Sequence, residues 1–233
     1  NTVFPTATVV HRLDMATSGI MVMALNKETG DIVWQQNEED GDSEEWIGSW
    51  STPLIVNVAG KDQVVIGFPG HVKGYDPGTG ELLWTCRGLS GLVYADIVIS
   101  DGIAIATGEN EEGNSIGFRL GGRGDVTASR RLWAKERSME VSTGVIVDGH
   151  LWAVDDDGIL RVTDIETGEV VIKQRAKGGP AWGSMLYANG YVFYTAKSGE
   201  TVIFRQDPPG PKIIRVNTFA EPSNSTPAFS EGE

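Results

Sequence analysis

A polar turn that occurs three times along the chain decides the fold. It reads Asn26-Lys27-Glu28-Thr29-Gly30, then Asp76-Pro77-Gly78-Thr79-Gly80, then Asp164-Ile165-Glu166-Thr167-Gly168. The leading Asn or Asp can accept hydrogen bonds from the backbone N–H groups that follow it. The Thr-Gly step supplies a residue that adopts positive φ easily. A large apolar residue follows each glycine at the same offset, so the three copies predict repeated β-hairpins of one design.

Short strand patterns separated by turn residues fill the rest of the chain from about residue 46. They form four sets of four strands, over 52–86, 95–134, 142–174 and 183–216. No stretch of ten or more residues keeps a helical pattern, and residues 121–129 read as an insertion in place of one tight turn. The residues that close successive sets recur every 39 to 50 positions; they are Trp34, Trp84, Trp133, Ile172 and Ile214.

Four strands at such a period are typical of β-propeller blades. The sequence therefore predicts an all-β, partial propeller of about five four-stranded antiparallel blades, with the terminal blades incomplete. Because the chain opens on Asn1 and stops inside what reads as a further strand, we expect it to be a fragment of a longer protein.

Composition excludes several classes of function. The formal net charge of −13 opposes binding to phosphate backbones, so no nucleic-acid partner is expected. No apolar run is long enough to predict a transmembrane segment. Cys86 is the single cysteine, which excludes an intramolecular disulfide; we expect it to be a small apolar residue within a strand.

The repeat Ala-x-Asn/Asp-x-x-Thr-Gly-x-x-x-Trp resembles the tryptophan-docking repeat of the PQQ-like, or quinoprotein-type, β-propellers over residues 24–233. Ser49-Trp50-Ser51-Thr52-Pro53 and Asn224-Ser225-Thr226-Pro227-Ala228 resemble the start of the innermost strand in such blades. The resemblance implies that the closing tryptophan packs against an adjacent blade. The residues with this structural role would be Trp34, Trp84 and Trp133, with Gly30, Gly80 and Gly168 in the turns.

A second resemblance covers residues 3–27. His11-Arg12-Leu13-Asp14, followed by Thr17-Ser18-Gly19, resembles the active-site segment of the Rlu-type RNA pseudouridine synthases. That resemblance implies a catalytic carboxylate at Asp14, with Arg12 assisting a flipped-out base. The later Arg- and His-rich segment of that family is absent from this sequence. Residues 1–23 are thus either a junction segment or strands of the first blade, and we expect Asp14 to be catalytically idle.

Four residues near the starts of innermost strands are candidates for a ligand- or partner-binding surface: Trp50, Tyr94, Asp96 and Trp182. The alternative is that the two tryptophans only wedge between blades. Asp155-Asp156-Asp157-Gly158 fits either a calcium site or a hairpin turn, and the turn is favoured. His71 and His150 lack a second metal ligand at suitable spacing, so we expect both to be structural and expect no metal site.

The predicted function is a non-enzymatic scaffold that binds a protein or a small ligand on its axial face. A PQQ-dependent dehydrogenase is an alternative by resemblance, but those families need adjacent cysteines, and Cys86 stands alone; we expect neither PQQ nor calcium as a cofactor. A pseudouridine synthase fragment is the other alternative. The PQQ-like resemblance implies a periplasmic or cell-surface location by analogy.

Overall fold

The computed structural model describes residues 7–11, 20–38, 48–89, 92–108, 114–136, 142–207, 210–219 and 221–229. In these ranges almost every element is a β-strand, and the one helix, α1 (Thr127–Arg130), has four residues. No helix in these ranges is long and apolar enough to cross a membrane. The predicted all-β fold is therefore confirmed.

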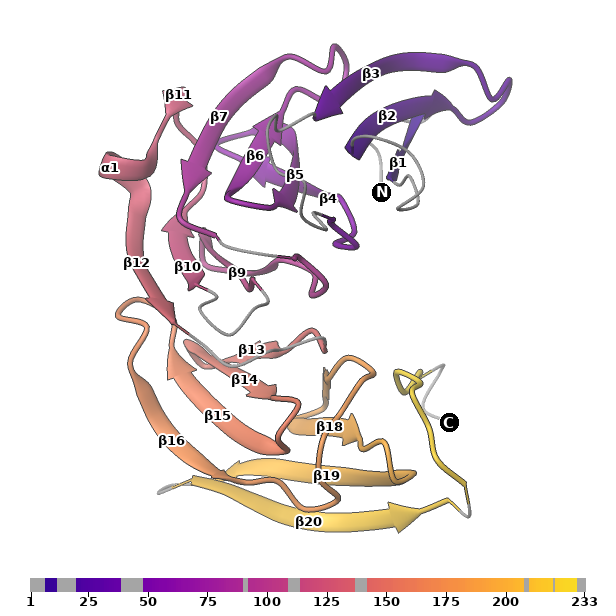
Figure 1. Ribbon diagram of the computed structural model, residues 1–233, viewed down its shortest axis with the longest axis vertical. Coiled ribbons are helices and arrows are strands. Elements are labelled where there is room, and N and C mark those ends of the chain that lie inside the picture. The colour runs from indigo at the N-terminus through magenta and orange to yellow at the C-terminus, as the bar shows by residue number, and fades with distance from the viewer. Residues whose placement is uncertain are drawn as a thin grey trace.

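The strands form five sheets that follow one another around a common centre as an arc (Figure 1). The first sheet contains β1 (Ala7–His11), β2 (Ile20–Asn26) and β3 (Ile32–Glu38). The second contains β4 (Leu54–Val58), β5 (Lys61–Phe68), β6 (His71–Tyr75), β7 (Leu82–Arg87) and the short β11 (Gly124–Asp125).

The third sheet contains β8 (Val98–Ser100), β9 (Ile103–Ala106), β10 (Asn114–Arg119) and β12 (Arg131–Glu136). The fourth contains β13 (Val145–Val147), β14 (His150–Val154), β15 (Ile159–Asp164) and β16 (Val170–Arg175). The fifth contains β17 (Leu186–Ala188), β18 (Tyr191–Thr195), β19 (Glu200–Asp207) and β20 (Gly210–Thr218). Within each of these sheets the main strands pair antiparallel in chain order, as in propeller blades.

The innermost hairpin of each four-stranded unit closes with the same tight turn. Its two central residues both have positive φ, which is the geometry of a type I′ turn and matches the twist of the flanking strands. The four pairs are Ala59-Gly60, Asp101-Gly102, Asp148-Gly149 and Asn189-Gly190. Asn and Asp tolerate this conformation better than other non-glycine residues, so three of the four pairs have the expected chemistry and Ala59 does not.

The hydrophobic core lies between neighbouring sheets. One buried cluster joins the second and third sheets through Trp84, Phe118 and their neighbours, and another joins the fourth and fifth through Trp152 and Phe204. Two smaller clusters join the first to the second sheet and the third to the fourth. Each pair of neighbouring sheets thus buries facing side chains against each other, which is how a propeller is stabilised.

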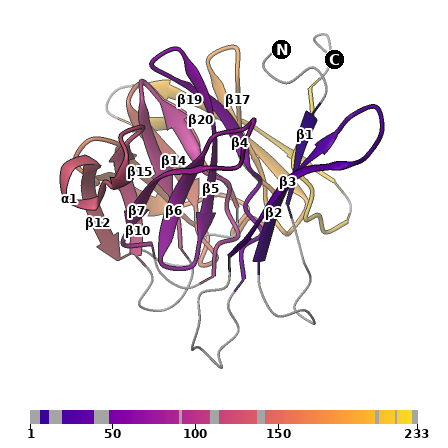
Figure 2. The same cartoon turned by 90° about the horizontal axis from the view of Figure 1, so that it is seen from above.

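The predicted insertion at residues 121–129 reaches back to the preceding sheet. Its strand β11 pairs in parallel with β7, with Gly124 opposite Trp84. The backbone N–H of Arg87 donates to the hydroxyl of Thr127, and the Arg87 guanidinium pairs with Asp125. Because β7 is the outer strand of the second sheet, the insertion covers an edge that would otherwise be unpaired. α1 lies on the opposite side of the molecule from the first sheet (Figures 1 and 2).

The register of the fifth sheet corrects one expectation. In the first four sheets the closing residue sits just past a β-bulge, opposite a residue of the preceding strand, as Trp34 is opposite Ala24. In the fifth sheet the bulge leaves Ile214 without a direct partner and places Arg215 opposite Ile203. The structural equivalent of the closing tryptophan is therefore Arg215, not Ile214. The sequence misled because the strands β19 and β20 pair as far as Asp207 opposite Gly210, so this hairpin lacks the Thr-Gly turn from which the offset of the closing residue was counted.

The segment that resembles a synthase motif contributes strands to the first sheet. β1 pairs antiparallel with β2, from Ala7 opposite Asn26 to His11 opposite Val22, and β2 pairs with β3. A boundary at residue 24 would therefore fall inside β2. Arg12 and Asp14 lie outside the described residues.

Candidate functional site

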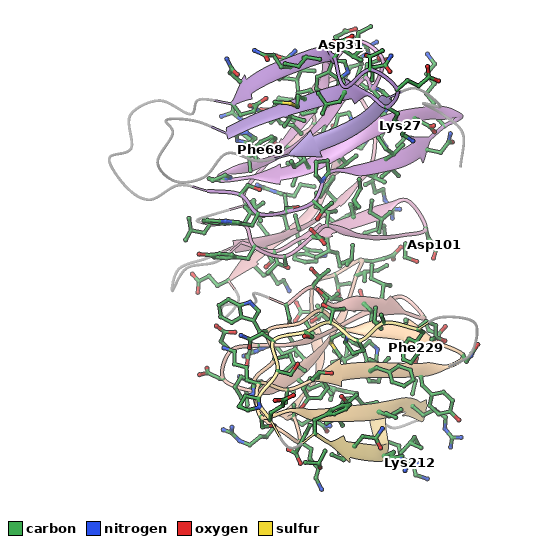
Figure 3. All side chains as sticks on the ribbon, turned by 90° about the vertical axis from the view of Figure 1, so that its right-hand side faces the viewer. Lys27, Asp31, Phe68, Asp101, Lys212 and Phe229 are labelled. Carbon is green, nitrogen blue, oxygen red and sulfur yellow. The ribbon has the colours of Figure 1, made fainter. Side chains whose placement is uncertain are left out.

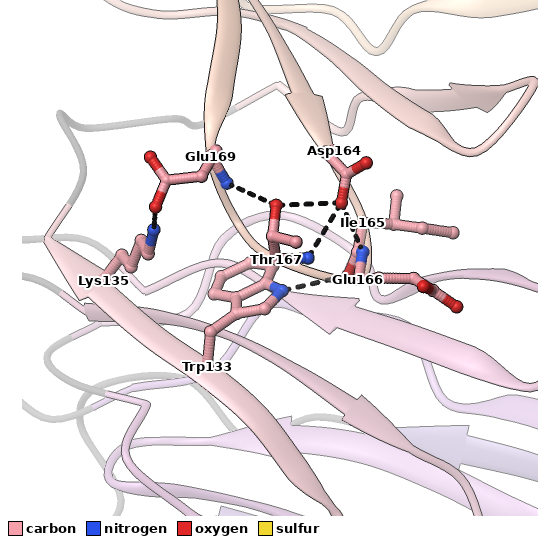
Figure 4. Close-up of polar contacts among 7 residues, drawn as sticks. All are labelled: Trp133, Lys135, Asp164, Ile165, Glu166, Thr167 and Glu169. Carbon is pink, nitrogen blue, oxygen red and sulfur yellow. Dashed lines mark hydrogen bonds and ion pairs between the residues drawn. The ribbon is translucent and has the colours of Figure 1, made fainter.

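The leading Asn or Asp accepts the same backbone hydrogen bonds in each copy of the recurring turn, while the Thr29 hydroxyl of the first copy donates to Asp31 instead. In the third copy the carboxylate of Asp164 accepts from the backbone N–H groups of Glu166 and Thr167 and from the Thr167 hydroxyl, which itself accepts from the Glu169 N–H (Figure 4). Hydrogen bonds from Thr167 lower the pKa of Asp164 below its ordinary value of 3.8. The side chains of Asn26 and Asp76 accept the equivalent backbone bonds.

Two indoles of outer strands contact the turn of the next sheet. The Trp133 indole N–H donates to the carbonyl oxygen of Ile165 at 2.9 Å (Figure 4), and the Trp34 indole N–H donates to that of Pro77 at 2.8 Å. A Cβ at Gly168 would lie 2.6 Å from the Trp133 ring. A Cβ at Gly80 would lie 2.7 Å from the Trp34 ring. Glycine at the end of the turn thus lets the neighbouring ring lie directly on the backbone.

Trp84 differs, because the next sheet carries the insertion in place of this turn. Its ring is fully buried and tilted against Phe118, and its indole N–H donates to the side chain of Gln63 within its own sheet. At the fourth sheet the smaller Ile172 lies against Gly210, 3.3 Å from a Cβ placed there.

The starts of the innermost strands are also linked from sheet to sheet. The Asp96 carboxylate accepts the Thr52 N–H at 2.5 Å, while the Thr143 hydroxyl accepts the Asp96 N–H at 2.9 Å. The Ser184 N–H donates to the Thr226 hydroxyl at 2.9 Å. Side-chain oxygens at one repeated position therefore join neighbouring sheets near the centre of the arc. We call the side of the arc on which the innermost strands begin the axial face.

Trp50 and Tyr94 come together on the axial face. Their rings stack with centroids 4.5 Å apart and planes inclined by 7°, and both side chains are half-buried. The Trp50 N–H donates to the carbonyl of Val93, whose own N–H donates to Gly48. The pair therefore lies at the boundary between the second and third sheets. Asp96, two residues after Tyr94, accepts the Thr52 N–H with one carboxylate oxygen.

Trp182 lies apart from that pair, before the fifth sheet, and 46% of its surface is exposed. The Lys197 ammonium stands 4.7 Å from the centre of its ring, a cation–π contact. Burial raises the pKa of the Asp156 carboxyl, and the Lys197 charge opposes part of that rise. Three turns therefore bring an exposed indole, a cation and a carboxyl into one neighbourhood. Sequence reasoning named Trp182 as a binding residue and Asp156 only as part of the aspartate run, and no spacing links either of them to Lys197.

The aspartate run has the geometry of a turn. The Asp155 carboxylate accepts from the N–H groups of Asp157 and Ile159, pairs with the Arg161 guanidinium, and is fully buried. Among the described residues, no three His, Cys, Asp or Glu side chains gather closely enough to hold a metal ion. Burial raises the pKa of the Cys86 thiol to about 11.

The comparisons with known proteins agree with this geometry. Residues 7–174 match the family described as outer membrane protein assembly factor BamB. The chain belongs to this family. The matched range begins at residue 7, so it includes the residues that resemble the synthase motif.

Solved structures show the same fold as this BamB-family chain. The crystal structure of BamB from Moraxella catarrhalis superposes with a TM-score of 0.69 over 91% of this chain and 65% of that one, at 16% identity. The β-propeller domain of Myceliophteria thermophila Cps50 (Swd1) superposes with a TM-score of 0.56 over 92% and 72%, at 14% identity.

One curated relative is an enzyme. Quinoprotein alcohol dehydrogenase PedH of Pseudomonas putida is 37% identical over 81 residues, which are 32% of this chain and 13% of that enzyme. The chain thus spans about an eighth of the length of this relative. The PQQ-like propeller resemblance is confirmed, and none of these matches supports the resemblance to pseudouridine synthases.

Proposed function

We propose that this chain is a non-enzymatic propeller scaffold that binds a partner protein through its axial face. The observation that carries the proposal is the exposed indole of Trp182 with Lys197 over its ring. Large exposed aromatic side chains next to a charge are typical anchors of protein interfaces. Trp50, Tyr94 and Asp96 would extend the same face toward the second and third sheets.

The role of the outer-strand indoles is structural in this proposal. Trp34 on Gly80 and Trp133 on Gly168 form docking contacts that hold neighbouring sheets in a fixed arrangement, and Trp84 contributes by packing on Phe118 of the next sheet. Gly30 shapes its own turn, and no ring lies on it among the described residues. The donation from Trp133 to Ile165 and from Trp34 to Pro77 supports this role. A rigid scaffold keeps loop residues of different sheets at constant distances, which lowers the entropic cost of binding.

The family description supports a partner among the proteins that assemble the bacterial outer membrane, and hence a periplasmic or cell-surface location. This remains a proposal about the whole protein, because the chain covers 65% of the Moraxella BamB structure.

The similarity to PedH raises quinone-dependent oxidation as a second candidate. The described residues do not fit it: Cys86 is buried within β7, and no cluster of three metal ligands lies among them. We therefore propose no chemistry on a quinone. Equilibrium dialysis of the chain against pyrroloquinoline quinone with Ca²⁺ tests whether the quinone binds. Stoichiometric binding would support the enzymatic candidate.

Site-specific photocrosslinking tests the proposed binding face. The chain would be exported to a bacterial periplasm with benzoylphenylalanine in place of Trp182 or, as a control, of Tyr187. The two side chains are matched, at 46% and 48% exposed, but Tyr187 lies within β17, whereas Trp182 lies before the start of that strand. We expect a discrete crosslinked protein from position 182 and none from position 187. Equal crosslinking from both positions, or from 187 alone, would contradict the proposed face.

A further inference from the structure

Four arginines gather along the outer edge of the second sheet, where the insertion covers β7. Arg87 ends β7, Arg123 directly precedes β11, Arg130 ends α1 and Arg131 begins β12. The side chains of Arg87 and Arg123 are 71% and 70% exposed, and Arg131 is exposed as well. We call these four residues the arginine row.

The row follows β7 along its length. Arg123 pairs with Glu81, just before the start of β7, at 2.9 Å, whereas Arg87 and Arg131 lie at the end of that strand. A strand rises about 3.3 Å per residue, so the six steps from Glu81 to Arg87 cover about 20 Å. The row is therefore long enough to contact an extended segment of about six residues.

Two of its guanidinium groups are held by backbone carbonyls and not by carboxylates. Arg131 Nη1 donates to the Arg87 carbonyl at 2.8 Å, and Arg130 Nη1 donates to the Leu120 carbonyl at 3.4 Å. A Cβ at Gly88 would clash with Arg131 Nη1, so glycine lets this guanidinium lie on the backbone. Neither arginine forms an ion pair with a described residue. Both charges are thus held in place without a counter-ion in the described part of the chain.

The other two arginines are paired only at the surface. Arg87 Nε lies 3.3 Å from the Asp125 carboxylate, and Arg123 pairs with Glu81; all four side chains are more than half exposed. Exposed ion pairs contribute little to stability, so the carboxylates of a partner can replace Asp125 and Glu81 at small cost. Four guanidinium groups and two carboxylates leave a local charge of +2 on a chain whose formal net charge is −13.

The row lies away from both ends of the arc. Figure 3 looks into the opening of the arc, with Lys27 and Asp31 at one end and Lys212 at the other, whereas α1 lies on the opposite, convex side (Figure 1). Packed clusters join the second sheet to the first and to the third, so the sheets on both sides of it are in place. Covering the β7 edge requires only the backbone of β11 and the Thr127 hydroxyl. That role does not account for the arginine side chains.

We infer that the arginine row binds an extended acidic segment of a partner protein. Residues 120–131 contain three arginines and no lysine. The planar fork of arginine can donate two parallel hydrogen bonds to one carboxylate, which a lysine cannot do. A broad anionic surface, such as a membrane, would face the acidic remainder of the chain as well as the row, and the net charge of −13 opposes that contact. The row lies on the convex side, so this binding surface is separate from the axial face.

Fluorescence anisotropy with labelled oligoglutamate peptides is the measurement. We expect fluorescein-labelled hexaglutamate to bind saturably, and to bind more weakly at about 150 mM than at about 20 mM salt, because salt screens exposed charges. Hexaglutamate should bind at least about tenfold more tightly than triglutamate, because only the longer peptide spans the row. Hexaglutamine is the uncharged control peptide and should not bind.

A double substitution removes the two guanidinium groups that have no counter-ion. Arg130→Gln combined with Arg131→Gln should weaken hexaglutamate binding at least about tenfold. The matched control is Lys173→Gln combined with Arg175→Gln, which removes the same charge from the exposed outer strand β16; Arg175 also donates to a backbone carbonyl. Circular dichroism melts verify that both double variants fold.

Arg123→Gln is a milder variant, because this exposed side chain contacts only the exposed Glu81. It should weaken hexaglutamate binding about threefold. A wild-type chain that does not bind hexaglutamate, equal affinity for triglutamate and hexaglutamate, or equal weakening by the double variant and its control would each overturn the inference.

Sedimentation with phosphatidylglycerol vesicles tests the membrane alternative. We expect the wild-type chain to stay in the supernatant at the salt concentration at which it binds hexaglutamate. Vesicle binding that the Arg130→Gln and Arg131→Gln substitutions abolish would show that the row binds lipid phosphate, and would overturn the assignment to an acidic protein segment.

Discussion

The Trp133 ring lies against the backbone of Gly168, so closely that a Cβ there would be 2.6 Å from the ring, while its indole N–H donates to Ile165 two residues before the Thr-Gly step. One side chain therefore makes a packing contact and a hydrogen bond with a single turn of the next sheet. The sequence repeat works as a joint between sheets for this reason.

Gly168→Ala and Gly30→Ala should differ in their cost. Both positions have positive φ, so alanine costs each about 1 kcal/mol in backbone strain. Only Gly168 also has a ring against it, which adds about 1–3 kcal/mol of overpacking. Urea unfolding of the two variants measures the difference. Equal losses of stability would show that the indole contact contributes nothing.

Trp133→Phe isolates the hydrogen bond. The phenyl ring keeps most of the packing on Gly168 but leaves the Ile165 carbonyl without its donor, so we expect a loss of about 1–2 kcal/mol in the free energy of unfolding. Trp133→Ala also opens a cavity and should cost about 3–5 kcal/mol. Thermal and urea unfolding give both values; a phenylalanine variant as unstable as the alanine variant would mean that the bond matters more than the ring.

The charge of Asp164 should contribute to stability only above its ordinary pKa. Its pKa is lowered on folding, so its contribution is present above about pH 3.8 and is lost as the pH falls through the lower, folded value. Asp164→Asn keeps an acceptor, as Asn26 does in the first turn. We expect the Asp164→Asn variant to have a free energy of unfolding lower than the wild type by less than about 1 kcal/mol at pH 7, because the group is exposed. The difference between the two proteins should become smaller in acid. A deficit that does not change between pH 7 and pH 3 would contradict the assignment.

Removing Arg161 should be costly. Its guanidinium pairs with the fully buried carboxylate of Asp155, so Arg161→Ala leaves a buried charge without its counter-ion, at a cost of about 3–5 kcal/mol. Adding Asp155→Asn should recover much of that loss, because the neutral amide still accepts from Asp157 and Ile159. Chemical unfolding of the single and double variants tests this prediction, and a double variant no more stable than Arg161→Ala would contradict it.

Cys86 should be inert in the folded chain. Burial raises the pKa of its thiol to about 11, so little thiolate exists at pH 8, and the side chain is inaccessible. We expect a disulfide-exchange reagent to react with it at pH 8 only after urea unfolds the protein. Rapid labelling under native conditions would show that β7 opens locally.

The sequence by itself determined the elements and their order. Each Asx-x-x-Thr-Gly turn is stabilised by its own side chains, as the hydrogen bonds within Asp164–Glu169 show. Within the strands, the alternation of apolar and polar residues indicates which side chains are buried. The strand ranges and the partial propeller followed from this local chemistry, and so did Trp34 and Trp133 as large residues at a fixed offset.

Only the tertiary structure decided what those elements meet. The bulge that puts Arg215, not Ile214, at the closing position depends on the pairing of β19 with β20. The insertion that covers β7 joins residues of different sheets, and Trp182 meets Lys197 from a different loop of the fifth sheet. Such contacts depend on the angle and register between sheets, which no single stretch of sequence encodes.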